Sequence, residues 1–535
     1  MRLGLDVIPE RIISALVVLA WLSGCQPTES PPADSRPNIL LILADDLGLT
    51  DVGFFGGEIP TPNLDALAFE GVRLTNFHVA PSCMQTRAML MSGMTNHEAG
   101  VAVHNDPLRP DVATLPERLR AAGYHTYMAG KWNLGIEASQ GPAARGFELS
   151  FALLPPGDNH LGASLFSEDT VAYRENGQPT TLPPGWFSSR LYTDKLIEYI
   201  DTNAGDGVPW FGYLAFTAPH WPLQAPEDWI DRHAGRYDDG YDVLREARFE
   251  TAAELGVLPQ GLTLEGYRGD APPWESLGED DRKALARAME IYAAMTENMD
   301  LNVGRVIDFL DASGQLDNTV ILFTSDNGAS GSDSSFVPST IPRTDTDNSL
   351  ANMGREGSFT AYGRGWAEAA TAPYRDVKGS LHSGGTLAAT FVHHGAILNK
   401  GGMDGTYLTI MDVLPTLVEI AGGDAIGDSF EGRGVLPVRG TSFWGSLTAD
   451  ATGISPGPEP RATPWMTSPH RGAVVRWPWK VISDQRAAPD APLQWSLFNL
   501  EEDAGERHDL SATQSEVQSE LVTIWEDYSR GVNVR

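Results

Sequence analysis

The stretch RPNILLILADD, residues 36–46, combines an unbroken apolar run with an abrupt charged end. A strand with one wet face alternates apolar and polar residues, whereas a continuous apolar run is typical of a parallel strand that is covered on both faces. The run stops at two adjacent carboxylates, Asp45 and Asp46. The stretch therefore predicts a buried parallel strand of an α/β sheet, with polar side chains at its carboxyl end.

Helix and strand patterns alternate after this stretch. Residues 61–71, TPNLDALAFEG, predict a helix that is followed by a glycine stop. Residues 114–123, TLPERLRAAG, begin with the capping box Thr114-x-x-Glu117 and lead into a predicted strand, YHTYMAGKW. Each helix lies between strands, which is the order expected of an α/β protein.

A long amphipathic helix is predicted from Asp281 to near Gly314, because its apolar residues recur on one helical face. The strand NTVILFTSDNG, residues 318–328, follows it directly. We therefore expect a large mixed, mostly parallel sheet sandwiched by helices.

The composition changes after about Gly440, where turns rich in proline and glycine separate short aromatic strands. Examples are GAVVRWPWKVI, residues 472–482, and WSLFNLEED, residues 495–503. We expect a main α/β domain over residues 37–440 and a smaller C-terminal subdomain with an antiparallel sheet over residues 441–535.

The N-terminus predicts a processing signal. Arg2 and Arg11 precede the apolar run IISALVVLAWLSGC, which is too short to span a membrane, and its last four residues resemble a bacterial lipobox ending at Cys25. Residues 1–24 would then be a lipoprotein signal peptide, Cys25 would be lipidated, and residues 25–36 would form a flexible tether. This predicts a membrane-anchored lipoprotein on the periplasmic or cell-surface face. A generic secretory peptide is the alternative.

The chain is strongly acidic. Its 535 residues include 71 Asp+Glu against 38 Lys+Arg, for a formal net charge of -33. This charge argues against non-specific binding to nucleic acid or to anionic membrane surfaces. An anionic substrate would have to be held by local cations.

Two predicted strands end in oxygen ligands. Asp45 and Asp46 end the first strand, and Asp326 and Asn327 end the strand after the long helix. Hard oxygen donors from two strand ends suit a divalent cation, with Ca²⁺ favoured over Mg²⁺ because it tolerates irregular geometry. The alternative is that these residues are ordinary turn or cap residues.

Basic side chains follow other apolar strands. Lys131 closes YMAGKW, His220 closes WFGYLAFTAPHWP, and Lys378 lies in YRDVKGSLHSGG. Each alone is most often structural or solvated, but their shared position makes them candidate ligands for an anion.

A single cysteine, Cys83, remains once Cys25 is lipidated, so no disulfide partner is left for it. In APSCMQTRAMLMSG the spacing predicts a helix with Ser82 as N-cap, Cys83 in the first turn and Arg87 one turn later. A buried structural cysteine and a thiolate nucleophile are the two ordinary interpretations. The thiolate is a poor match for a site built from hard oxygen ligands.

The motifs LADDLG, CMQTRAMLMSG, MAGKW, APHWPLQAP, TSDNGA and VKGSLHSGG occur here in the order found in type I sulfatases. The chain resembles that family, and bacterial arylsulfatases most closely, from about Pro37 to the C-terminus. The ordered set is far more specific than any one motif. The resemblance implies an alkaline-phosphatase-like α/β fold and a sulfuric ester hydrolase that acts on a small-molecule sulfate ester.

The resemblance also implies a mechanism. Cys83 would be converted to formylglycine (3-oxoalanine) by a formylglycine-generating enzyme or another maturase, and one hydroxyl of its hydrate would attack sulfur. The alcohol leaves, and the second hydroxyl expels sulfate by regenerating the aldehyde. Arg87 would stabilise the hydrate, while Lys131, His220 and Lys378 would hold the sulfate, with His220 assisting the leaving oxygen. The matching calcium ligands are Asp45, Asp46, Asp326 and Asn327.

Three positions depart from the family pattern. Gln85 stands where the modification motif has proline or alanine, Asn133 stands where a histidine contacts the formylglycine hydroxyl, and GGTLAA from Gly384 replaces GGIRVP. Asparagine can form hydrogen bonds but cannot act as a base at neutral pH. Two alternatives therefore stay open: a sulfate-ester-binding homologue without turnover, and a related phosphate or phosphonate ester hydrolase.

Overall fold

The computed structural model describes residues 35–166, 171–264, 269–333, 346–423, 426–448, 463–468, 471–484 and 492–532. Residues 36–535 form one compact unit. The predicted signal peptide, Cys25 and nearly all of the tether lie outside the described residues. No helix among the described residues is both long and apolar enough to cross a membrane.

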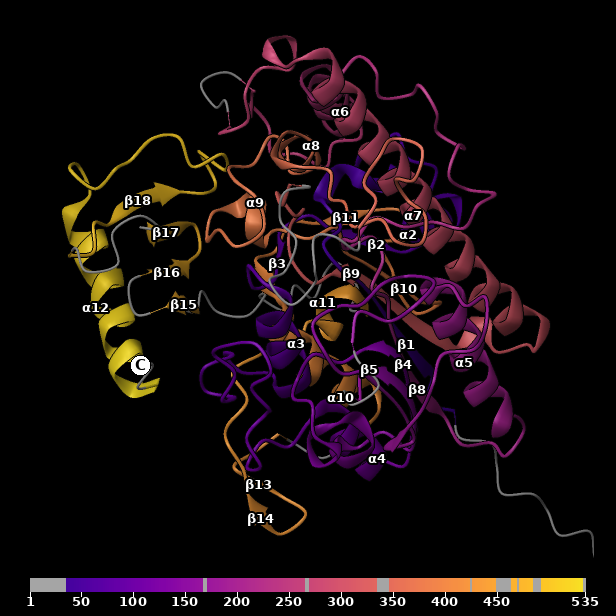
Figure 1. The fold of residues 1–535 in the computed structure, drawn as a ribbon. Helices are drawn as coiled ribbons and strands as arrows, with labels where there is room; N and C mark the ends of the chain where they lie inside the picture. Colours follow the sequence, from indigo (N-terminus) through magenta and orange to yellow (C-terminus); the bar gives the residue numbers. More distant parts are fainter. Residues whose placement is uncertain are drawn as a thin grey trace, which may run out of the picture. The chain divides into compact units, whose positions relative to one another are not determined.

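The main domain is built on a ten-stranded sheet (Figure 1). Its strands in spatial order are β11 (Met403–Asp404), β2 (Val72–Leu74), β10 (Phe391–His393), β9 (Thr319–Ser325), β1 (Asn38–Ala44), β8 (Trp210–Ala215), β4 (His125–Lys131), β5 (Leu149–Leu153), β6 (Tyr173–Glu175) and β7 (Gln178–Pro179). The strands from β9 to β5 run parallel, whereas β10 and β6 pair antiparallel with their neighbours. The predicted mixed, mostly parallel sheet is confirmed.

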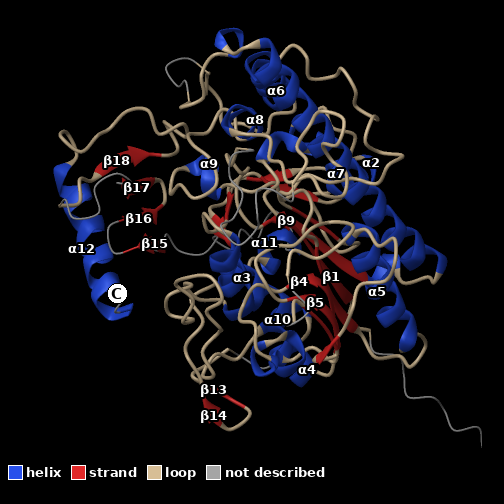
Figure 2. Ribbon diagram, in the orientation of Figure 1, coloured by secondary structure: helices blue, strands red, loops and turns tan. Residues whose placement is uncertain are grey.

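The central strand β1 shows why its sequence is apolar throughout. Ile39, Leu41 and Leu43 belong to one buried cluster, and Leu40 and Ile42 belong to another on the opposite face. Full burial of each such side chain stabilises the fold by about 1.5–3 kcal/mol. The first cluster also contains residues of α3 (Cys83–Ser92), α4 (Leu115–Ala121) and α10 (Val413–Ile420). The second contains residues of α2 (Pro62–Glu70), α5 (Ser188–Thr202) and α7 (Glu279–Ala312). Figure 2 shows the helices around the sheet.

The predicted helix signals are present. In α4 the Thr114 hydroxyl accepts from the Glu117 amide, and the Glu117 carboxylate accepts from the Thr114 amide at 2.8 Å, which completes the capping box. Helix α7 begins two residues before Asp281 and ends at Ala312. Its first half packs with α6 (Tyr241–Glu254) and α8 (Arg364–Ala370) in a third buried cluster.

The C-terminal part contains the predicted antiparallel sheet. Its strands are β15 (Thr463–Ser468), β16 (Arg471–Arg476), β17 (Trp479–Asp484) and β18 (Ser496–Asn499), paired in that order. Leu521 and Trp525 of helix α12 (Ser515–Val532) pack against this sheet. The boundary after residue 440 stays a prediction. The remaining strands and helices are β3 (Phe77–His78), α9 (Ser383–Thr386), β12 (Leu408–Thr409), β13 (Ser429–Phe430), β14 (Arg433–Gly434) and α11 (Trp444–Thr448).

Candidate active site

The predicted site residues gather where parallel strands end. Asp45 and Asp46 follow β1, and Asp326 and Asn327 follow β9. The last residue of β4 is Lys131. The carboxyl ends of parallel strands lie at one edge of a sheet, which is where open α/β sheets place their ligands.

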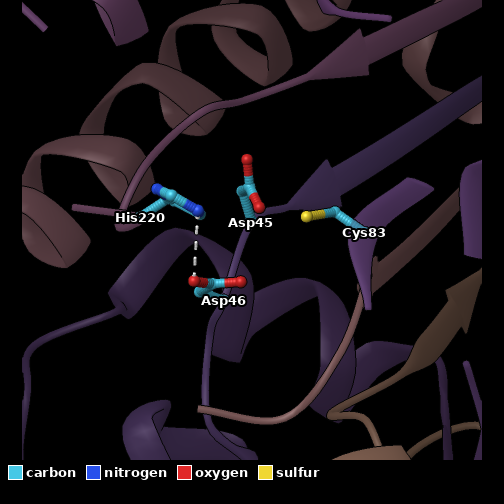
Figure 3. Close-up of side chains that lie close together, drawn as sticks. All are labelled: Asp45, Asp46, Cys83 and His220. Atoms are coloured by element: carbon cyan, nitrogen blue, oxygen red, sulfur yellow. Dashed lines mark ion pairs between the residues drawn. The ribbon is translucent and has the colours of Figure 1, made fainter. Parts of the chain in front are cut away.

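Four of the predicted site residues, which come from three separate segments of the chain, form a buried group. One ligand atom each from Asp45, Asp46, Cys83 and His220 lies within 4.8 Å of the others (Figure 3). His220 comes from the loop after β8, and its Nε2 lies 3.5 Å from Asp46 Oδ2. The structure thus brings the cysteine segment, the first strand end and the histidine loop together.

The β9 residues complete the acidic side of the site. Asp326 Oδ1 accepts a hydrogen bond from the Asp46 amide at 3.2 Å. Asn327 Nδ2 donates to Asp46 Oδ1 at 2.7 Å. Asp46 has a φ of 66°, a left-handed conformation that aspartate tolerates better than most residues. The two hydrogen bonds tie the ends of β1 and β9 together.

Two ammonium groups, one buried and one partly buried, balance the carboxylates. Lys131 Nζ lies 2.5 Å from Asp45 Oδ2, and Lys378 Nζ lies 2.5 Å from Asp46 Oδ1. Burial alone would raise the pKa of Asp45, but the charge of Lys131, followed by those of His220 and Arg87, holds it below its ordinary value. The pKa of Asp46 is likewise held below its ordinary value, by the charges of His220 and Lys378, so both carboxylates are kept ionised although they are buried, whereas burial and the charge of Asp45 raise the pKa of Asp326.

The donor set suits a hard cation. Asp45 Oδ1, Asp46 Oδ2 and Asn327 Oδ1 are buried and have no hydrogen-bond partner among the described residues. Leaving buried acceptors unpaired costs about 1–3 kcal/mol each, so three such oxygens in one place indicate a ligand. Oxygen atoms of this kind are what Ca²⁺ and Mg²⁺ require.

Cys83 is the first residue of α3 and is a free, buried cysteine. Lys378 Nζ lies 3.6 Å from its Sγ. Burial raises the pKa of the Cys83 thiol, although Lys131 and Lys378 oppose the shift. A protonated thiol at neutral pH is a poor nucleophile, which speaks against the thiolate interpretation.

The predicted N-cap position of Ser82 is confirmed, but the serine does not cap the helix through its side chain. The turn before α3 is held instead by Thr86, whose hydroxyl accepts from the Ala80 amide at 2.9 Å. The start of α3 therefore has no side-chain cap of its own.

Asn133 lies two residues after Lys131, in a left-handed conformation with a φ of 57°. Its side chain is buried, and both amide atoms lack a hydrogen-bond partner within the part of the chain that the structure describes. A buried carboxamide without partners is unusual in folded proteins. Asn133 is thus able to bind a polar group.

Sequence reasoning missed His160, which supports His220. His160 Nε2 lies 2.8 Å from the His220 carbonyl oxygen, and its Nδ1 lies 2.7 Å from Ser188 Oγ. Burial lowers the pKa of His160 to about 4, so the ring is neutral at pH 7 and donates through Nε2 to the carbonyl. A lone histidine in a loop carries no sequence signal for such a contact.

His220 itself is held through its other nitrogen. His220 Nδ1 lies 2.5 Å from the Trp221 carbonyl oxygen, which fixes the proton on Nδ1 and turns Nε2 towards Asp46. Burial lowers the pKa of His220, although the charge of Asp46 opposes the shift.

The mixed sheet with an oxygen-rich site at its strand ends defines an alkaline-phosphatase-like α/β enzyme. Residues 37–423 match the model of the family described as Sulfatase. The chain is 38% identical to an uncharacterized sulfatase of Schizosaccharomyces pombe, with 93% of this chain and 94% of that protein covered. It is 36% identical to an arylsulfatase of Klebsiella aerogenes, with 76% and 91% covered. The chain belongs to the sulfatase family.

A solved structure has the same fold. The crystal structure of Ps i-CgsB in complex with k-i-k-neocarrahexaose superposes with a TM-score of 0.66 at 22% identity, covering 92% of this chain and 93% of that one. At this identity the likeness shows the fold alone.

Proposed function

We propose that this protein hydrolyses sulfate monoesters in the manner of an arylsulfatase, with residue 83 as the nucleophilic position. One observation carries the proposal: the buried Cys83 lies beside the ammonium of Lys378 and within 4.8 Å of donor atoms of Asp45 and Asp46. Membership of the sulfatase family and the likeness to a named arylsulfatase support it.

The cationic side chains would bind the sulfate group. Lys131 is buried and Lys378 is partly buried, and they pair with Asp45 and Asp46, so both ammonium groups are fixed in direction. Preorganised cations in a dry site stabilise developing negative charge far better than mobile ones in water. Arg87, one helical turn after Cys83, adds a third fixed cation.

His220 would move the proton. Its Nδ1 proton is committed to the Trp221 carbonyl, so Nε2 is the atom that would first take up a proton and then pass it to the leaving oxygen. Asn133 would contribute a hydrogen bond near residue 83, because both of its amide atoms lack partners among the described residues.

The acidic residues would hold the metal. Asp45, Asp46, Asp326 and Asn327 supply hard oxygen atoms, and we propose Ca²⁺ as the bound ion. Such an ion would polarise a sulfate oxygen. Formylglycine derived from Cys83, as the family resemblance implies, would supply the attacking hydroxyl.

The test is hydrolysis of 4-nitrophenyl sulfate by the protein co-produced with a formylglycine-generating enzyme. Cys83→Ala should abolish turnover, whereas Ser82→Ala should leave it unchanged, because the Ser82 hydroxyl makes no hydrogen bond with the described residues. Faster turnover of 4-nitrophenyl phosphate or of a phosphonate monoester than of the sulfate would favour the related hydrolase instead. Binding of the sulfate ester without turnover would favour a sulfate-ester-binding homologue.

The location of the protein is a separate proposal that rests on the N-terminal sequence. We propose that residues 1–24 are removed, that Cys25 is lipidated, and that the enzyme acts on the periplasmic or cell-surface face. Metabolic labelling with an alkyne-bearing fatty acid should mark the wild type but not Cys25→Ala. Equal labelling of both would exclude this anchor.

A further inference from the structure

The turn that carries Lys378, here the Lys378 turn (residues 378–385), is tied to both sides of the active site. The Gly379 amide donates to the Pro81 carbonyl at 2.7 Å, just before the cysteine helix. The Lys378 amide donates to the Ala329 carbonyl at 2.9 Å, just after the end of β9. The backbone of the turn is therefore anchored between residue 83 and the acidic strand end.

A third set of contacts comes from the C-terminal sheet. Asp484, the last residue of β17, accepts from Ser380 Oγ at 2.8 Å and from the Leu381 amide at 3.3 Å. Arg471, the first residue of β16, donates to the Gly379 carbonyl at 2.5 Å and to Asp484 Oδ1 at 2.5 Å. An acidic and a basic residue of one sheet thus hold successive residues of the turn.

Glu506, which follows β18, holds the end of the turn. Its carboxylate accepts from the Ser383 amide at 2.6 Å and lies 2.8 Å from Lys480 Nζ and 3.2 Å from His382 Nδ1. Burial alone would raise the pKa of Glu506, but Lys480 and then His382 hold it well below its ordinary range. A fully buried carboxylate is thus kept charged beside the turn.

The turn has little freedom to reorganise. A Cβ built on Gly384 would lie 2.0 Å from the Asp376 carbonyl oxygen, and one built on Gly328 would lie 1.9 Å from the Gly384 carbonyl oxygen. Such close backbone packing tolerates glycine alone. A shift of the C-terminal contacts would therefore move the turn as a unit.

We propose that Asp484, the last residue of β17, and Glu506, in the segment after β18, are positioning residues for Lys378, setting its ammonium between Asp46 and residue 83. The lysine side chain is a flexible four-carbon stem, so the position of its charge depends on how rigidly the backbone that carries it is held. The contacts from the C-terminal sheet and from the segment after β18 hold that backbone in place. This inference rests on the proposed role of Lys378 in binding sulfate.

A double-mutant cycle between Asp484→Asn and Lys378→Ala tests the inference with 4-nitrophenyl sulfate. Asparagine can still accept from Ser380 but loses the charge paired with Arg471. We expect Asp484→Asn alone to lower kcat/KM by about tenfold, since small misplacement of a binding group is costly. In the Lys378→Ala background the same change should have no further effect, because residues that act through one another are not additive. Inhibition by inorganic sulfate should weaken in parallel.

Glu520→Gln is the matched control. Glu520 lies in α12 and pairs with Arg476 of β16, so it belongs to the same subdomain but does not touch the Lys378 turn. It should leave kcat/KM unchanged. Ser380→Ala removes one hydrogen-bond donor to Asp484 and should lower kcat/KM by less than Asp484→Asn does. It replaces Asp484→Asn in the experiment if that variant does not fold.

The outcomes separate the two claims. If Asp484→Asn lowers kcat/KM equally with and without Lys378, or leaves it and sulfate inhibition unchanged, the positioning role is wrong. If Lys378→Ala itself leaves turnover unchanged, the proposed binding role of Lys378 fails before any question of its positioning arises.

Discussion

Arg87 donates two hydrogen bonds to the same carboxylate oxygen of Asp326, from Nε at 3.1 Å and from Nη2 at 2.8 Å. Its third contact, from Nη1 to the Lys131 carbonyl at 2.7 Å, reaches the end of β4. One guanidinium therefore joins the helix that begins with Cys83 to two strand ends. This network needs the planar fork of arginine, which lysine cannot reproduce.

Arg87→Lys should consequently destabilise the fold although it keeps the charge. Losing hydrogen bonds to buried partners should lower the free energy of unfolding by about 1–3 kcal/mol. Urea denaturation measures this loss. Arg109→Lys is the matched control, because Arg109 forms an exposed pair with Asp111; a loss of equal size in both variants would contradict the role of the network.

Asp326→Ala should abolish or greatly weaken Ca²⁺ binding. It removes one proposed ligand and also frees the Arg87 guanidinium, whose positive charge would then repel the ion. Calorimetric titration of metal-free protein with Ca²⁺ measures the affinity. Asp317→Ala, at an exposed position before β9, should bind the ion as the wild type does. Full affinity in Asp326→Ala would exclude the proposed metal site.

Asn133→His should raise the turnover of an activated aryl sulfate. The substitution adds a base at a position where the amide now has no partner among the described residues, and histidine tolerates the left-handed conformation nearly as well as asparagine. Steady-state and single-turnover kinetics locate the affected step. Unchanged or lower turnover would mean that the pocket is adapted to asparagine.

His160 should make the stability of the protein sensitive to mild acid. Its pKa is lowered from 6.5 to about 4 by burial, so between these values the unfolded chain binds a proton that the folded one does not. Stability must then fall as pH decreases, by about 2 kcal/mol from pH 7.5 to pH 5 for this group. His160→Gln should lose this contribution in urea denaturation at the two pH values, whereas the exposed His508→Gln should keep it. Identical pH slopes for wild type and His160→Gln would contradict the assignment.

The chemical state of residue 83 can be measured directly by mass spectrometry of the tryptic peptide 74–87 from the native host. We expect the aldehyde form, which lacks the thiol mass and reacts with a hydrazide probe. Gln85→Pro, which restores the usual modification motif, should raise the converted fraction in a heterologous host. If residue 83 is found only as alkylatable cysteine in this peptide, the formylglycine mechanism is excluded for this protein.

The parts of the fold that could be predicted are those in which local pattern and burial agree. The unbroken apolar run of β1 predicted a strand covered on both faces, and the capping box of α4 predicted a helix start that the hydrogen bonds confirm. Ser82 occupies the predicted N-cap position, but its side chain makes no capping hydrogen bond, and the Thr86 hydroxyl binds the Ala80 amide in the turn before the helix. Local preference was right about the helix and wrong about the contact.

The acidic and basic site residues could be proposed from the sequence because each follows an apolar strand. The sequence could not have indicated His160, Asp484 or Glu506, because each acts through a contact with a residue 60 or more positions away. No local periodicity encodes such a contact. Only the closure of the sheet and the docking of the C-terminal strands bring these residues to the site.

The burial of Cys83 determines whether its modification must come before or after folding of the domain. Its side chain is only 3% exposed, beneath helices and strand ends contributed by distant parts of the sequence. A modifying enzyme cannot reach a residue in that position once the domain has closed. Any conversion of Cys83 must therefore take place on the nascent or still unfolded polypeptide, in competition with folding, and a chain that folds first keeps its thiol permanently.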